Sequence, residues 1–155
     1  MTNPMSRRFV VFAGLLATPV VTAVTPPSTP ASKPAPDARV GKLEKFFGDR
    51  DCPLRDHAAE FIEVADRNHL DWRLLPSISL VESGGGKDYR NNNVFGWANC
   101  KRTFPTVSDG IHMVARRLSR SRLYRHKSLD RILATYNPQP AYSLKVKTVM
   151  RSIAN

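Results

Sequence analysis

A lone glutamate, Glu82, ends an apolar run and is followed by three glycines, three asparagines and an aromatic pair. A carboxyl group at the C-terminal end of an apolar helix is poorly solvated and faces the negative end of the helix dipole. Both effects raise the pKa of a carboxyl group, which can then donate a proton near neutral pH, as general acid catalysis requires. The alternative is an exposed glutamate at a helix end, with no chemical role.

The residues that follow Glu82 favour the catalytic interpretation. Three glycines (84–86) are costly in chain entropy and suit a backbone that must approach a ligand closely. Three asparagines (91–93) supply amides for the hydroxyl and acetamido groups of a sugar, and Phe95 and Trp97 supply faces for stacking on its rings. Each also has a structural alternative: the asparagines in a turn, Phe95 in the core and Trp97 as a core plug.

Four segments together carry a more specific resemblance, over roughly residues 54–153. They read "LLPSISLVESGGGK", "NNNVFGW", "FPTVSDGIHMVARRL" and "YNPQPAYSLKVKTVM". This combination resembles the lysozyme-like superfamily, and within it the bacterial endo-β-N-acetylglucosaminidases and lytic transglycosylases that act on peptidoglycan. The resemblance implies a small helical domain with a central cleft.

The resemblance also implies roles for individual residues. Glu82 matches the catalytic acid, and Tyr142 matches a late tyrosine that faces it; the alternative for Tyr142 is a core tyrosine with a bonded hydroxyl. The residues that match the substrate-binding cleft are Asn92, Asn93, Phe95, Gly96, Tyr136 and Asn137. We add Trp97 to this set because of its stacking face, and we expect Tyr136 to form the cleft wall.

One departure from the pattern bears on the reaction. Soluble transglycosylases carry a "GLMQ" segment after the glutamate, whereas this chain has "FGW", which favours the glucosaminidase-like branch without excluding transglycosylation. Two-carboxylate glycosidases need a partner acid at a set separation. The nearest candidate, Asp88, is interpreted as a solvated loop residue. We therefore expect Glu82 to act alone, assisted by the 2-acetamido group of the substrate.

The elements that must position these residues are expected to be helices. Apolar residues recur at helical spacing nearly throughout residues 40–155, with no sustained alternation, so an all-α domain is predicted. Pro76 lies about a turn inside the helix that carries Glu82, so a kink or a tight first turn is expected there. The helices are expected to start at Pro53, Asp71, Ser108 or Asp109, Ser128 and Pro140. The core side of the first helix is expected to consist of Leu54, Ala58, Phe61, Ile62 and Ala65. The core side of the last helix is expected to consist of Val146, Val149, Met150 and Ile153.

The N-terminal residues 1–23 have the features of a secretory signal peptide. Arg7 and Arg8 precede an apolar run that breaks at Pro19 and is too short for a transmembrane helix. We therefore expect an exported protein, periplasmic or extracellular; an uncleaved anchor would leave the compartment unchanged. Residues 24–39 include "PPSTPASKPAP" and are predicted to be an extended linker, followed by one folded domain over residues 40–155.

Two cysteines, Cys52 and Cys100, are predicted to form a disulfide, because an even count is typical of exported chains. The alternative is two buried free thiols. The four histidines are scattered without a second ligand at helical spacing, so neither a metal site nor a cofactor is expected.

The charge of the chain favours an anionic partner. Without the proposed signal peptide, 22 basic and 13 acidic residues remain, a net charge of +9. We expect a monomer that binds peptidoglycan and meets an anionic wall or membrane surface through its basic face. One alternative is a wall-binding module that has lost catalysis. Another is a cationic protein that binds membranes or nucleic acid. No RNA-binding motif or strongly amphipathic basic helix supports this second alternative, so no nucleic-acid partner is expected.

Overall fold

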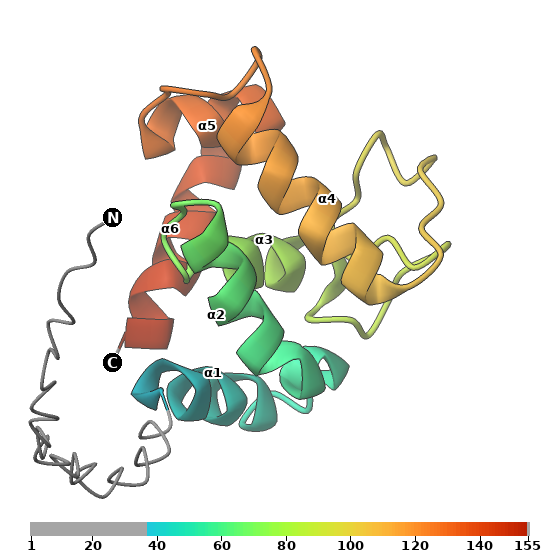
Figure 1. Ribbon diagram of the computed structural model, residues 1–155, viewed down its shortest axis with the longest axis vertical. Coiled ribbons are helices and arrows are strands. Elements are labelled where there is room, and N and C mark those ends of the chain that lie inside the picture. Colours follow the sequence, from blue (N-terminus) through green and yellow to red (C-terminus); the bar gives the residue numbers. More distant parts are fainter. Residues whose placement is uncertain (1–36, 155) are drawn as a thin grey trace, which may run out of the picture. The chain divides into compact units, whose positions relative to one another are not determined.

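A computed structural model of the chain describes residues 37–154, which form an all-α domain without strands in that range (Figure 1). The prediction of an all-α fold is therefore confirmed. The predicted signal peptide and most of the predicted linker lie outside the described residues. The elements are α1 (Ala38–Gly48), the 3-10 helix η1 (Pro53–His57), α2 (Ala58–Arg67), α3 (Leu74–Ser83), α4 (Val107–Arg120), α5 (Leu129–Tyr136) and α6 (Pro140–Ala154).

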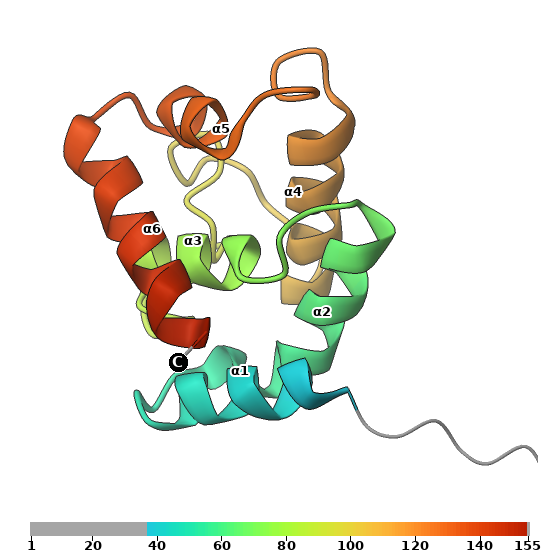
Figure 2. The same cartoon turned by 90° about the vertical axis from the view of Figure 1, so that its left-hand side faces the viewer.

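Helix α3 is the central element of the domain. Figure 2 shows it between α6 on one side and α2 and α4 on the other, and α6 is its most extensive partner. A helix that is apolar on all sides must be covered on all sides. The first six residues of α3, 74–79, are all buried. The helix that carries Glu82 is thus held rigidly by the rest of the domain.

Helix α1 is an addition to the predicted elements, and its cap and first turn take up the last three residues of the predicted linker. Asp37 caps it by accepting a hydrogen bond from the Arg39 backbone N–H (2.9 Å). Leu43 and Phe47 are fully buried, and the Phe47 ring lies 6.0 Å from that of Phe61 in α2. The apolar stripe of α1 therefore completes the core beneath α2.

The apolar stripe predicted after Pro53 is confirmed as core, but this segment is two elements. Pro53 opens η1, and α2 begins only at Ala58. Helix α3 likewise begins later than expected, since its N-cap is Arg73 and the Asp71 carboxylate only accepts a bond from the Arg73 backbone N–H. Pro76 therefore lies in the first turn of α3, where its missing N–H would have no helical partner.

The starts of the last three helices follow from their caps. Thr106, one turn before the start expected at Ser108 or Asp109, is the N-cap of α4; its side chain and that of Asp109 form a reciprocal capping box. Ser128 caps α5, as predicted, and α6 begins at Pro140, as predicted. Of the stripe predicted for α6, Val146, Met150 and Ile153 are buried, and Val149 packs partly buried against the core. No helix within residues 37–154 is long and apolar enough to cross a membrane.

The predicted disulfide between Cys52 and Cys100 is wrong, because both cysteines are free thiols. Cys52 is buried at the start of η1, where its sulfur lies 3.4 Å from the carbonyl oxygen of Gly84. Cys100 is exposed in the segment between α3 and α4. The even number of cysteines says nothing about where the fold places each of them, and here it places them in different environments.

The two thiols are expected to differ sharply in reactivity. Burial raises the pKa of the Cys52 thiol and shields it, so an aromatic disulfide reagent should label Cys100 at once in the native protein and Cys52 only after denaturation. Thiol titration of the oxidatively purified protein, with and without guanidinium, measures this. If the denatured protein showed no titratable thiol, the two cysteines would not be free, and the predicted disulfide between Cys52 and Cys100 would be correct.

Candidate active site

Glu82 is the penultimate residue of α3 and lies at the negative end of the helix dipole, as predicted from the sequence. The helix ends because Gly84 adopts a left-handed conformation (φ 61°), and its N–H donates to the Leu80 carbonyl. The buried hydroxyl of Ser83 donates to the Val94 carbonyl oxygen (2.8 Å) and accepts from the Gly86 N–H (3.2 Å). These bonds fix the backbone on both sides of the glutamate.

The glycines after Glu82 serve packing against η1 rather than an open cleft floor. A Cβ atom on Gly85 would lie 2.5 Å from the sulfur of Cys52, and one on Gly86 would lie 3.0 Å from Cγ of Leu54. The Gly85 carbonyl also accepts the backbone N–H of Leu54 (3.1 Å). These glycines were expected to bring the backbone close to a ligand. In the structure, Gly85 and Gly86 bring it close to Cys52 and Leu54 of the protein itself.

A different glycine lies against the carboxyl group. A Cβ atom on Gly96, whose φ is 61°, would lie 2.5 Å from Oε2 of Glu82. The loop backbone at Gly96 thus covers one side of the carboxyl group at a distance that no side chain tolerates. Gly96, which the resemblance places in the cleft, is in the structure a neighbour of Glu82.

Tyr142 also faces the carboxyl group, from the first turn of α6. Its side chain is only 5% exposed, and its buried hydroxyl makes no hydrogen bond of standard geometry within residues 37–154. It nevertheless lies near enough to Glu82 to act on the pKa of that carboxyl. A buried hydroxyl without a partner is uncommon in folded proteins and indicates a group that a ligand or water can satisfy.

The Glu82 carboxyl group and the Tyr142 hydroxyl each have a raised pKa. Burial raises the pKa of Glu82, and interaction with the Tyr142 hydroxyl lowers it in part. Burial, with the neighbouring Tyr136 and Glu82, raises the pKa of Tyr142 far above the physiological range, so its hydroxyl keeps its proton. No second carboxylate and no cation within the described residues counts among the groups that act on the Glu82 pKa.

A row of aromatic rings extends from this pair. Tyr142 stacks on Tyr136 with ring centres 5.8 Å apart and planes 6° from parallel. Tyr136 meets Trp97 edge to face at 5.5 Å, and Trp97 lies 6.2 Å from Tyr124. The Tyr136 hydroxyl donates to the carbonyl oxygen of Phe95, which joins α5 to the loop after α3. Tyr136 and Trp97, both predicted for a substrate cleft, are thus in contact with each other.

This row lines a hollow of about 310 Å³ next to Glu82. Its walls are the segment Gly96–Asn99 together with Tyr124 and Tyr136. Gly96 borders both this hollow and the Glu82 carboxyl group, whereas Glu82 itself does not line the hollow. Tyr124 was missed in the sequence; the only signal for it was an aromatic residue within the basic run from Arg116 to Lys127.

The asparagines predicted to bind substrate make hydrogen bonds within their own loop in the structure. The Asn92 amide donates to the carbonyl oxygens of Phe104 and Pro105 (both 3.0 Å). The buried Asn93 amide donates to the carbonyls of Trp97 and Arg102, and its oxygen accepts the Trp97 N–H. Irregular backbone needs such partners, so these amides are already satisfied.

Two other predicted substrate contacts, Phe95 and Asn137, do not line the hollow. Phe95 is fully buried, with its ring packed edge to face against Phe61 at 6.5 Å, so only its backbone carbonyl takes part in the site. Asn137 follows α5, and its side-chain oxygen accepts the Gln139 N–H (3.0 Å). The structure therefore brings Glu82, Tyr142, Gly96, Tyr136 and Trp97 together, and not the amides or the Phe95 ring.

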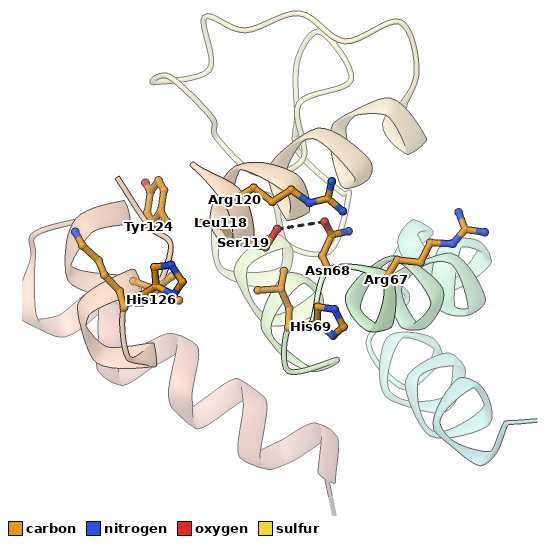
Figure 3. Close-up of a pocket in the computed structure, with 11 residues that line it drawn as sticks. Arg67, Asn68, His69, Leu118, Ser119, Arg120, Tyr124 and His126 are labelled. Atoms are coloured by element: carbon orange, nitrogen blue, oxygen red, sulfur yellow. Dashed lines mark hydrogen bonds between the residues drawn. The ribbon is translucent and has the colours of Figure 1, made fainter. Parts of the chain in front are cut away.

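A larger hollow, of about 550 Å³, lies on another side of the domain, between the ends of α2 and α4 and the segment before α5 (Figure 3). In this view the Arg120 side chain extends over Asn68, toward Arg67. The Ser119 hydroxyl donates a hydrogen bond to the side-chain oxygen of Asn68 (3.2 Å). Tyr124 is the only residue that borders both hollows. No carboxyl group lines this larger hollow, so it lacks a candidate acid.

Neither Asp88 nor a metal site adds chemistry to Glu82 within the described residues. Asp88 is exposed, and its backbone N–H donates to the Ser83 carbonyl (3.0 Å). No group of three His, Cys, Asp or Glu side chains in residues 37–154 is arranged to hold a metal ion. The chemistry of this site is that of one carboxyl group and one tyrosine hydroxyl.

The fold and the site define a small all-α domain with a partly buried glutamate beside a row of aromatic side chains. No protein-family model, no curated protein and no solved structure matches the chain.

Proposed function

We propose that this protein is an exported enzyme that cleaves β-1,4 glycosidic bonds in the glycan strands of peptidoglycan. The observation that carries the proposal is the environment of Glu82: a carboxyl group whose pKa is raised by burial, faced by the unpartnered Tyr142 hydroxyl and flanked by aromatic rings. The lysozyme-like resemblance names the class of substrate, and this environment suits acid catalysis on such a polymer.

In the proposed reaction, the protonated Glu82 donates its proton to the glycosidic oxygen as the bond from that oxygen to C1 breaks. The carbonyl oxygen of the substrate's 2-acetamido group bonds to C1 and takes the place of a nucleophilic carboxylate. The absence of a second acid near Glu82 within residues 37–154 supports this assistance by the substrate. The Glu82 carboxylate then removes a proton from the attacking hydroxyl group, which displaces the acetamido oxygen.

The attacking group decides the product. If it is water, the enzyme is an N-acetylglucosaminidase-like hydrolase and the product has a reducing end. If it is the 6-hydroxyl of the same sugar, the enzyme is a lytic transglycosylase and the product is a 1,6-anhydro sugar. The "FGW" segment favours hydrolysis. Tyr136, stacked on Tyr142, and the half-buried Trp97 supply the aromatic surface next to Gly96 on which a sugar ring can pack.

The test is digestion of purified peptidoglycan by the mature protein, with mass spectrometry of the released fragments. Fragments with reducing ends or 1,6-anhydro ends support the proposal and distinguish its two forms. Retention on insoluble peptidoglycan without release of fragments would favour the alternative of a wall-binding module that has lost catalysis.

Tyr142→Phe is expected to lower the cleavage rate by about 10²-fold, the loss typical of one hydrogen-bond donor aimed at a reacting group. The stability should change little, because the buried hydroxyl that the variant removes makes no hydrogen bond of standard geometry within residues 37–154. Since this hydroxyl lowers the Glu82 pKa, its loss should also move the alkaline limb of the pH–rate profile to higher pH.

A purely structural Tyr142 gives a different pattern. In that case Tyr142→Phe would leave the rate and the pH profile unchanged. Rates on solubilised glycan between pH 4 and 9, together with thermal melting, separate the two roles.

A further inference from the structure

A further hollow, of about 580 Å³, lies on the side of Trp97 that faces α4. We call it the arginine hollow, after its four arginines. Its lining residues are Trp97, Ala98, Arg102, Met113, Arg116, Arg117, Arg120 and Ser121. None of these residues is acidic. Trp97 and Ala98 also line the aromatic hollow beside Glu82, so the two hollows share a wall.

Asp109 lines a neighbouring hollow together with Arg102, Arg116 and Arg120, but within the described residues it forms an ion pair with none of the four arginines. None of their guanidinium groups makes an ion pair or a side-chain hydrogen bond within residues 37–154. Other arginines of the domain differ: Arg39, Arg67 and Arg73 each pair with a carboxylate. Bringing like charges together without partners is unfavourable, and an anionic ligand would relieve that cost.

The position of the arginines at the end of α4 accounts for only part of the cluster. Cations in the last turn of a helix are stabilised by its dipole, which explains Arg117 and Arg120. Arg102 comes from the loop before α4 and gains nothing from that dipole. A second signal is the hydroxyl of Ser121, which lines the same hollow and is buried without a hydrogen-bond partner in the described residues.

We propose that the arginine hollow is a subsite for carboxylate groups carried on the glycan strand, namely those of its peptide substituents. This inference rests on the proposed function, since it places the glycan along the aromatic row and its substituents across Trp97. Planar guanidinium groups bind carboxylates through paired hydrogen bonds, and the Ser121 hydroxyl can donate a further one. The subsite would make the enzyme prefer peptide-bearing strands to bare ones.

The test uses the double variant Arg102→Gln/Arg117→Gln and measures retention on insoluble peptidoglycan free of phosphate-bearing polymers. One sample of this wall material is intact, and in a second the peptide carboxylates have been converted to amides. The variant should bind intact walls about five- to tenfold more weakly than the wild type, as expected for two exposed charge pairs. On amidated walls the two proteins should bind equally, and both more weakly than the wild type binds intact walls.

The matched control is Arg122→Gln/Arg125→Gln, which removes the same charge from two exposed arginines outside the hollow. The control should bind intact walls as the wild type does. If the two double variants lost retention on intact walls equally, a general charge effect would replace the subsite. The same conclusion would follow if Arg102→Gln/Arg117→Gln lost as much retention on amidated walls as on intact walls. Binding to vesicles of anionic phospholipid is measured as well. If Arg102→Gln/Arg117→Gln bound only these vesicles more weakly than the wild type, and walls equally well, a membrane surface would replace the carboxylate subsite.

The binding measurement also separates this inference from the proposed enzymatic function. Cleavage of either wall material by the wild type is recorded in parallel by release of soluble fragments. Carboxylate-dependent retention without any cleavage would support the subsite and contradict the enzyme. Cleavage that is equally fast on intact and amidated walls, with equal retention, would support the enzyme and contradict the subsite.

Discussion

Glu82→Gln should reduce glycan cleavage by about 10²- to 10⁴-fold, the contribution typical of a positioned general acid. Glutamine has nearly the same shape as glutamate but cannot donate a proton to the glycosidic oxygen. Because the protein should still bind the polymer, the loss should appear in the turnover rate and not in retention on insoluble walls. Fragment release and cosedimentation, measured on the same preparation, check both parts.

The same substitution should leave the domain as stable as the wild type or more so at neutral pH. Burial raises the Glu82 pKa in the folded state above the ordinary value of 4.5, so the folded protein holds this proton to higher pH than the unfolded chain. The free energy of unfolding of the wild type therefore falls as the pH rises between the two pKa values. Glutamine lacks this ionisation, so the advantage of the variant should vanish at pH values below 4.5.

Asp88→Asn is the control, because Asp88 is an exposed acid near Glu82 in sequence. It should change the rate less than twofold. A large loss in Asp88→Asn would show that the mechanism uses a second carboxylate. A Glu82→Gln variant that clears wall suspensions at the wild-type rate would remove the basis of the proposed mechanism.

Gly96→Ala should damage both stability and catalysis. An alanine there must adopt a left-handed backbone, which costs roughly 1–2 kcal/mol, and its Cβ atom would lie 2.5 Å from the Glu82 carboxylate oxygen. Either the loop or the carboxyl group must shift, and a displacement of about 1 Å at a reacting group can cost about 10²-fold in rate. Chemical denaturation and wall digestion measure the two effects.

Gly41→Ala is the matched control, since a Cβ atom at that exposed position of α1 would meet nothing within 4 Å. It should raise the stability by up to about 1 kcal/mol, the helix propensity gain of alanine over glycine. A double-mutant cycle isolates the contact: in a Glu82→Ala background, Gly96→Ala should retain only the backbone part of its cost. An equal cost in both backgrounds would show that Gly96 and the carboxyl group do not interact.

The helical elements were readable from the sequence where one local signal decides them. The spacing of Phe61, Ile62 and Ala65 predicts the buried face of α2, and Gly84 predicts the end of α3 because it tolerates a left-handed backbone. Starts were less accurate where several capping residues lie in a row. Thr106 rather than Ser108 caps α4, because the reciprocal bond with Asp109 selects it.

The candidate site was readable in its chemistry and not in its contacts. Glu82 at the end of an apolar helix predicts a raised pKa, since burial and the helix end are both local properties of the chain. The amides of Asn92 and Asn93 fit a sugar or a loop equally well by composition. Only the folded loop shows which carbonyl groups need them.

The sequence by itself determined that the chain folds as helices and that an acid ends the most apolar of them, because helical periodicity and helix termination act over a few residues. The tertiary structure decided what surrounds that acid. Gly96 lies in the loop after α3 and Tyr142 in α6, and both meet Glu82 only through packing. Trp97, next to Gly96 in the chain, meets Tyr136 of α5 in the same way. The same holds for the two cysteines, whose number suggested a bond that their positions in the fold do not make.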